Sequence, residues 1–400
     1  MDLIQTIQYI GNLVLKFVNS INFITFLLSL IISYHFLLLV LRDKQYIDNL
    51  NKYKNPENVS ISSLKELPLV NIVIPAWKEG AAFKKCLTLI NQLSYPKLKV
   101  ITNAGGSKET ISIANSFKNK ENFIVIYQKA GEGKLKAIND CLDYIFEGII
   151  FLIDADLYLS DEIIIKMMNP IINQDEQVVI SSIKPSHSII NIDIVKYLYI
   201  NRNIEFRQKF SRYICGVGSN VCIKYEALRK IGKFTEKRFS DDGLSIGMDL
   251  SSKGIKSYIL VNNKIPADTY PTKIIGYLNQ NIRWLENALF TSIKNKKLRI
   301  LQFLGLVIIS FFLLIFPFVL FFNIYFFLIG LIFLLSIYLK RVRKIVFYKL
   351  TNKNESIKLG YLFFLNLIFY IYLDLIINII VFFEMLFFRK GYKKRKNLLS

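Results

Sequence analysis

The chain has 400 residues, of which 52% are apolar, and its mean hydropathy is +0.35. So high an apolar content excludes an ordinary soluble enzyme, and it argues against a soluble nucleic-acid-binding protein although the formal net charge is +22. Strong positive charge beside long apolar segments is typical of an integral membrane protein that faces an anionic leaflet. We therefore expect membrane lipids, and no nucleic acid, among its partners.

The N-terminal region, residues 1–44, is predicted to lie on and then cross a membrane. Residues 1–18 mix apolar with polar side chains, as an interfacial amphipathic helix does. Residues 21–41 are almost wholly apolar and have the length of about 20 residues that a transmembrane helix needs. Arg42 and Lys44 follow, and because basic loops stay in the cytoplasm, the next domain is expected to be cytoplasmic.

A linker over 45–66 leads into residues 67–271, where apolar strand-like stretches alternate with helical ones. This alternation indicates βαβ units and an α/β domain with one mostly parallel, Rossmann-like sheet. The first strand is expected to stop at Pro75, and Asn103 to Ser107 is expected to be a turn. The predicted strands are 69–74, 98–102, 123–127, 148–153, 178–183 and 257–261.

After an interface helix within residues 272–298, the C-terminal third becomes apolar again. Residues 299–340 are long enough for two crossings with a reversal near Pro317 and Asn323, and residues 341–357 are expected to form a basic cytosolic loop.

A last membrane segment is predicted over residues 358–388, before a basic tail over 389–400. A single crossing would place the tail outside, against the tendency of basic segments to stay inside. A surface-lying, re-entrant or doubled-back segment would keep it inside, and the sequence leaves these alternatives open. Asp374 in this segment is costly in lipid, so it either faces other helices or belongs to a transport path.

Asp154 and Asp156 directly follow the predicted strand 148–153. Ligands of open α/β sheets bind beyond the carboxyl ends of the strands. Carboxylate oxygens suit a hard divalent cation, and such a cation can hold a diphosphate. The pair therefore predicts a metal and diphosphate site, although a solvated turn is the alternative for the tripeptide alone.

Two further sites carry charge at expected loop ends. Lys134 follows Gly131 and Gly133 at the start of a helix, where a phosphate is favourably bound, although the loop also fits an ordinary helix N-terminus. Asp241 and Asp242 offer a carboxylate at another loop end, and the alternative is an N-cap.

Gln280, Arg283 and Trp284 share one face of the predicted interface helix. Arginine can bind a diphosphate with two hydrogen bonds, glutamine can bind a sugar or phosphate, and tryptophan can stack on a sugar ring. The alternative is that tryptophan and arginine anchor the helix at the membrane interface, and both can hold together.

The motifs occur in a recognisable order: Pro75-Ala-Trp-Lys-Glu79, Gly133-Lys134, Asp154-x-Asp156, Ser240-Asp-Asp242 and Gln280-x-x-Arg283-Trp284. Over roughly residues 70–290 the chain resembles membrane-bound inverting family-2 glycosyltransferases, which include cellulose, chitin, hyaluronan and poly-N-acetylglucosamine synthases and ceramide glucosyltransferase. The resemblance implies a GT-A-type catalytic domain flanked by transmembrane helices. It also implies a nucleotide-sugar donor, commonly a UDP-sugar, and Mg²⁺ or Mn²⁺.

The resemblance further implies roles for single residues. Asp154 and Asp156 would bind the metal, Asp242 would be the general base, and Trp284, Gly216 and Gly218 would lie at the acceptor. The donor would be bound by Pro75, Ala76, Glu79, Asn103, Lys134, Asp154, Gln280 and Arg283.

Two departures from the family pattern leave choices open. The second strand of the family usually ends in an acid that contacts the uridine, and here Asn103 stands in that run, so Asn103 substitutes or the base differs. Ser240 and Asp241 replace the usual Thr-Glu, so Asp241 is an alternative base.

Three functions fit these features. The first is processive polysaccharide synthesis, and the second is transfer of a single sugar to a lipid acceptor. The third is a non-catalytic membrane scaffold that binds a nucleotide, although binding alone does not call for Asp242.

Overall fold

The computed structural model describes residues 3–18, 20–44, 59–186, 220–236, 242–294, 299–351 and 361–387. The chain divides into two compact units. The helical unit comprises Met1–Asn51 and Ile274–Arg389, and the sheet unit comprises Lys52–Lys273 and Lys390–Ser400.

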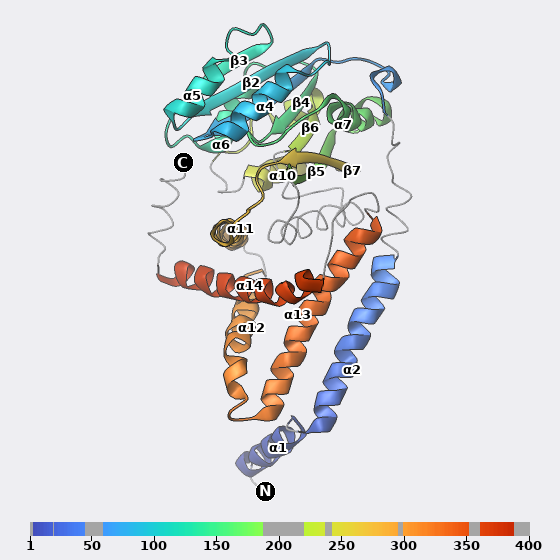
Figure 1. Ribbon diagram of the computed structural model, residues 1–400, viewed down its shortest axis with the longest axis vertical. Coiled ribbons are helices and arrows are strands. Elements are labelled where there is room, and N and C mark those ends of the chain that lie inside the picture. The colour runs from blue at the N-terminus through green and yellow to red at the C-terminus, as the bar shows by residue number, and fades with distance from the viewer. Residues whose placement is uncertain are drawn as a thin grey trace. The chain divides into compact units, whose positions relative to one another are not determined.

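A seven-stranded sheet with the order β3-β2-β1-β4-β6-β5-β7 forms the centre of the sheet unit (Figure 1). All neighbouring strands are parallel except for β6, which runs antiparallel to both β4 and β5. The mostly parallel sheet and all six predicted strands are therefore confirmed, whereas β6 was not predicted. The strands are β1 (Val70–Trp77), β2 (Leu98–Gly105), β3 (Phe123–Gln128), β4 (Ile149–Ile153), β5 (Val178–Pro185), β6 (Asn220–Lys224) and β7 (Ser257–Ala267).

Two predicted strand ends are wrong, because β1 and β2 are longer than expected and stay paired beyond the predicted ends. β1 pairs with β2 as far as Trp77 opposite Gly105, whereas its pairing with β4 stops at Val73 opposite Leu152. Pro75 thus stands where β1 has a neighbour on one side only, and a proline in a strand is tolerated at such an edge. Asn103 likewise belongs to β2 and not to a turn.

Two helices of the sheet unit, α5 and α7, begin at serine caps. The Ser107 hydroxyl accepts a hydrogen bond from the Thr110 amide, and the Ser160 hydroxyl accepts one from the Ile163 amide, which satisfies amides that the first helical turn leaves free. The helices are α4 (Ala81–Asn91), α5 (Lys108–Asn115), α6 (Gly133–Leu142), α7 (Asp161–Gln174), α9 (Tyr225–Ile231) and α10 (Asp242–Ser252).

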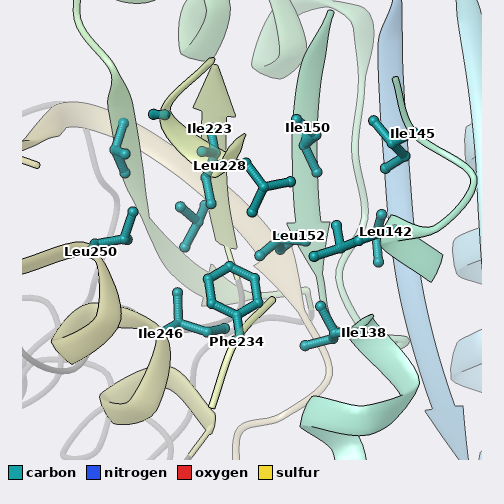
Figure 2. Packing of buried hydrophobic residues seen from close by; sticks show 14 of the residues in the cluster. Ile138, Leu142, Ile145, Ile150, Leu152, Ile223, Leu228, Phe234, Ile246 and Leu250 are labelled. Carbon is teal, nitrogen blue, oxygen red and sulfur yellow. The ribbon is translucent and has the colours of Figure 1, made fainter. Parts of the chain in front are cut away.

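A buried core fixes β4, the strand that leads to the two acids. Figure 2 shows Ile150 and Leu152 of β4 packed among apolar side chains of α6, β6 and α10. Full burial of one such side chain stabilises the fold by about 1.5–3 kcal/mol, so this core holds β4 firmly. Three cysteines, Cys86, Cys141 and Cys222, are fully buried and act as small apolar core residues.

Among the described residues, four helices are long and apolar enough to cross a membrane: Ile21–Asp43, Gln302–Val319, Ile324–Val346 and Phe363–Phe387. The predicted reversal is confirmed, since the Asn323 side chain accepts hydrogen bonds from the first amides of the helix that follows it. The elements are α1 (Leu3–Val18), α2 (Ile21–Leu37), a π-helical turn (Leu38–Asp43), α11 (Ile274–Lys294), α12 (Arg299–Val319), α13 (Ile324–Thr351) and α14 (Tyr361–Phe387).

Helices α2 and α13 pack along their apolar faces and are joined by polar contacts at one end. Ile24 and Ile31 of α2 pack against Ile329 and Ile332 of α13. Towards the C-terminal ends of both helices, Arg343 forms a buried ion pair with Asp43 at 2.7 Å, and the His35 ring lies 3.1 Å from the Ser336 hydroxyl. These contacts fix the register of the two helices.

α14 is one unbroken helix that runs across α12 and α13 instead of alongside them (Figure 1). Its continuity excludes the doubled-back alternative for this segment. Asn378 of α14 donates a hydrogen bond to Ser310 of α12, and Ile371 and Leu375 pack in one cluster with Leu313 and Phe316 of α12.

Candidate active site

Asp154 and Asp156 lie at the carboxyl edge of the sheet, directly beyond β4. The pairing of Leu152 with Val73 keeps β4 in register with β1, so the segments that follow the two strands leave the sheet at the same edge. Lys134, the second residue of α6, forms an ion pair with the Asp154 carboxylate. The structure thus brings together two motifs that the sequence placed 20 residues apart.

The carboxylate of Glu79, beyond the end of β1, interacts with the same group. Burial and the negative charge of Asp154 raise the pKa of Glu79 above its ordinary value, and Lys134 acts in the opposite direction. Burial, followed by the charges of Asp154 and Glu79, raises the pKa of Asp156 to about 7. Lys134 is the positive group that acts on both Glu79 and Asp156, so within the described part of the chain three carboxylates face this lysine and negative charge predominates.

This cluster fits a hard divalent cation. Mg²⁺ is commonly held by one or two carboxylates together with phosphate oxygens of a substrate, and Mn²⁺ prefers similar oxygen ligands. Among the described residues, no group of three or more His, Cys, Asp and Glu side chains has the arrangement of a complete metal site. Asp154 and Asp156 can thus supply part of the ligand set of such a cation, and a diphosphate and water can complete it.

The loop that carries Asp156 is braced by residues that sequence analysis did not single out. The Asp268 amide, just after β7, donates to the Asp156 carbonyl at 3.1 Å, and the Tyr158 amide donates to the Pro266 carbonyl at 2.9 Å. The Asp268 carboxylate accepts hydrogen bonds from the hydroxyls of Tyr158, at 2.5 Å, and Ser186. In the sequence, the feature that could have indicated this brace is the position of an acid, Asp268, directly after β7.

The predicted donor residues of β1 and β2 are buried within the strands. Pro75 and Ala76 lie inside β1, and the Asn103 amide group donates to the Ala137 carbonyl of α6 at 3.2 Å, with the side chain 1% exposed. Beyond them the Trp77 ring covers the end of β2, where a Cβ at Gly106 would lie 2.7 Å from the ring. This close approach explains why the residue at position 106 is glycine.

The remaining predicted site residues lie elsewhere in the described chain or outside it. Gln280, Arg283 and Trp284 are confirmed as residues of one helix, α11 of the helical unit, where Arg283 is exposed. Asp242 is the first residue of α10. Asp241, Gly216 and Gly218 lie outside the described residues.

Comparisons with known proteins relate part of the chain to glycosyltransferases. Residues 71–232 match the model described as Glycosyl transferase family 2. This segment of the chain is therefore similar to the domains of family-2 glycosyltransferases. The match covers β1 to α9 and therefore includes Glu79, Lys134, Asp154 and Asp156.

Two curated relatives match parts of the chain. Probable glycosyltransferase YdaM of Bacillus subtilis (strain 168) is 24% identical over 243 residues, which make up 56% of this chain and 56% of YdaM. Glycosyltransferase AglE of Haloferax volcanii is 27% identical over 94 residues, 22% of this chain and 31% of AglE. The chain thus spans about half, or less, of the length of these relatives.

A solved structure shares the fold of the chain. It is the mannosyltransferase PcManGT from Pyrobaculum calidifontis in complex with GDP-Man and Mn²⁺, with a TM-score of 0.54 and 14% identity over 92% of this chain and 99% of that chain. The GT-A-like fold, with its mostly parallel central sheet, is therefore confirmed.

Proposed function

We propose that this protein is a metal-dependent, inverting glycosyltransferase of the membrane that uses a nucleotide-sugar donor, in the first place a UDP-sugar. The observation that carries the proposal is the cluster of Glu79, Lys134, Asp154 and Asp156 at the carboxyl edge of a family-2 glycosyltransferase domain. The excess of carboxylates in this cluster suits a divalent cation, and such a cation suits a diphosphate.

The donor is held at the carboxyl edge of the sheet. Asp154 and Asp156 would hold Mg²⁺ or Mn²⁺, which when bound neutralises charge on the leaving nucleoside diphosphate. Lys134 is the second residue of α6 and supplies a positive charge where the helix N-terminus already favours phosphate. The brace through Asp268 and Tyr158 holds the Asp156 loop in place and so keeps the metal ligands preorganised.

A single displacement accounts for transfer with inversion. Asp242, or alternatively Asp241, takes the proton of an acceptor hydroxyl while its oxygen forms a bond to the anomeric carbon. The bond from that carbon to the diphosphate oxygen breaks, and the electron pair leaves with the nucleoside diphosphate. Gln280 and Arg283 would hold the diphosphate, and Trp284 would stack on the acceptor sugar.

The acceptor residues would lie at the cytoplasmic face of the cell membrane. The basic residues after α2 and in the second half of α13 indicate that the sheet unit is cytoplasmic. Gly216 and Gly218 belong to the predicted acceptor loop between β5 and β6. An acceptor anchored in the same membrane would meet the site without leaving the lipid.

Two acceptors remain in competition, and the packing of the helical unit favours one of them. Within the described helices, α2 packs directly on α13, and α12 packs directly on α14. Such close packing favours transfer of one sugar to a lipid acceptor over passage of a growing polysaccharide through the same helices. Processive polysaccharide synthesis, the first expectation from sequence, is the second candidate.

A panel of nucleotide sugars incubated with the purified protein, Mn²⁺ and membrane lipids tests the proposal through release of nucleoside diphosphate. We expect release from one donor, its loss in excess EDTA, and its loss in Asp242→Asn. A labelled product that enters organic solvent as a single species indicates a lipid acceptor, whereas a high-molecular-weight product indicates a polymer. Nucleotide binding without release from any donor would support a scaffold and reject the proposal.

A further inference from the structure

Asp374, in the middle of α14, contacts two other helices of the helical unit. The hydroxyl of Tyr277 on α11 donates to one Asp374 oxygen at 2.7 Å. Arg341 of α13 forms an ion pair with the other oxygen. Tyr277 is 3% exposed, and its ring also lies 5.9 Å from the ring of Tyr370, one turn earlier on α14.

These contacts explain why an acid is placed in an apolar helix. A carboxylate in a membrane segment is costly unless a charge or hydrogen-bond donor compensates it. Here each carboxylate oxygen has its own partner, and the two partners come from different helices. Asp374 therefore joins α11 to both α13 and α14, and the sequence alternative in which it faces other helices is confirmed.

The contact with Asp374 also fixes how α11 is rotated about its axis. Successive side chains turn by about 100° around a helix, so Trp284, seven residues after Tyr277, lies on nearly the same side two turns later. Arg283 is about a third of a turn away from Tyr277, and it is exposed while Tyr277 is buried. Burial of Tyr277 against α14 thus sets the direction in which Arg283 is presented.

We propose that Asp374 is a positioning residue for α11, which holds Gln280, Arg283 and Trp284 in their working orientation through its hydrogen bond to Tyr277. This inference rests on the proposed function, in which those three side chains bind the donor diphosphate and the acceptor. It gives the acid of the last apolar helix a role in sugar transfer, without placing it in contact with substrate.

Four variants of the full chain separate positioning from general packing. Asp374→Asn removes the charge that pairs with Arg341, and Tyr277→Phe removes only the hydroxyl that reaches Asp374. Asp374→Glu retains the carboxylate as the conservative variant. Ser310→Ala is the matched control, since it deletes the hydrogen bond from Asn378 of α14 to α12 and leaves α11 untouched.

The first readout is nucleoside diphosphate release from the active donor. Because small displacements of positioning groups cost about 100-fold in rate, we expect kcat to fall at least about tenfold in Asp374→Asn and Tyr277→Phe. The KM for the donor should change less than kcat, since Asp374 contacts α11 and not the bound donor. Asp374→Glu should recover most of the rate, and Ser310→Ala should match the parent.

The second readout does not depend on activity. The chain has two tryptophans, so in a Trp77→Phe parent the fluorescence of Trp284 alone reports on α11. The protein is placed in phosphatidylcholine vesicles with brominated acyl chains, and quenching of Trp284 is measured. We expect quenching to change in Asp374→Asn and Tyr277→Phe and to stay at the parent value in Ser310→Ala.

The two readouts distinguish failure of this inference from failure of the proposed function. Unchanged Trp284 quenching in Asp374→Asn would overturn the inference whatever the activity. Changed quenching with an unchanged kcat would overturn its link to catalysis. A parent that releases no nucleoside diphosphate from any donor would reject the proposed function, and the quenching result would still decide whether Asp374 positions α11.

Discussion

Asp156 lies among charged side chains that do not balance one another. Asp154 and Glu79 are negative, and Lys134 is paired with Asp154, so the Asp156 carboxyl is held in a half-buried and negative environment. Such an arrangement lowers stability unless something of positive charge binds there, because like charges in a partly buried site oppose each other's ionisation. Charge imbalance of this kind is typical of a functional site.

Replacing this carboxylate separates function from stability. We expect Asp156→Asn to lower nucleoside diphosphate release by at least about 100-fold, the effect of losing one preorganised electrostatic contact to a transition state. The unfolding temperature should not fall, since one of the opposing charges is removed. Release and thermal unfolding are measured side by side on the purified protein.

Asp143→Asn is the matched control, because Asp143 is 55% exposed and pairs with Lys233 on the surface. It should retain parental activity. Equal activity of Asp156→Asn and the parent would remove Asp156 from the active site.

At the scale of elements, the entry to β4 depends on one glycine. Gly148 has φ of 86°, a left-handed conformation, and a Cβ there would lie 2.2 Å from the Leu69 carbonyl oxygen. That carbonyl accepts the hydrogen bond of the Ile149 amide at 2.8 Å, so it cannot move without loss of the β1–β4 pairing. The strand that carries the acids thus begins at a point with no space for a side chain.

We expect Gly148→Ala to lower the free energy of unfolding by more than about 3 kcal/mol, the sum of a steric clash and a strained backbone. Gly131→Ala is the control, since Gly131 has nearly the same φ, 85°, with no atom within 4 Å of the added Cβ. It should cost only about 1 kcal/mol. Thermal unfolding of both variants checks the difference, and equal losses would show that the Leu69 contact is not limiting.

The direction of α14 leads to a prediction about the tail. Because α14 runs across α12 and α13, it would lie in the plane of a membrane that those two helices cross (Figure 1). Residues 389–400 should therefore lie on the same side as residues 352–360. We expect Ser400→Cys and Lys353→Cys to react with a membrane-impermeant maleimide from the same side of sealed vesicles.

Phe322→Cys reports on the other side, since Phe322 lies in the exposed reversal between α12 and α13. It should react only when the opposite face is accessible. Labelling of Ser400→Cys together with Phe322→Cys would show that α14 crosses the membrane.

At the scale of the whole molecule, the sequence predicts those strands, helices and turns whose formation depends on local residue patterns. Apolar runs identified the six predicted strands and the helices that are long enough to cross a membrane, since burial on both faces removes polar alternation and a membrane demands length. The Asn323 reversal followed from turn chemistry. β6 escaped prediction because five residues, Asn220–Lys224, carry too little pattern to distinguish a short strand from a core loop.

Contacts between residues far apart in the chain could not be predicted from the sequence, for a different reason. The Tyr158–Asp268 and Tyr277–Asp374 hydrogen bonds join residues 110 and 97 positions apart. No periodicity marks such a pair, because its geometry is set only after the sheet or the helices have packed. The acids themselves were visible as unusual residues, but their partners were not.

In the proposed function, Asp154 and Asp156 hold a nucleoside diphosphate through a divalent cation. The most direct test is calorimetric titration of the purified full-length protein with UDP and GDP, in Mn²⁺ and in excess EDTA. We predict that Mn²⁺ tightens binding of one of them at least about tenfold, a coupling of about 1.4 kcal/mol, and that Asp156→Asn abolishes this gain. Equal affinity of both nucleotides in Mn²⁺ and in EDTA, or an unchanged gain in Asp156→Asn, would contradict the claim.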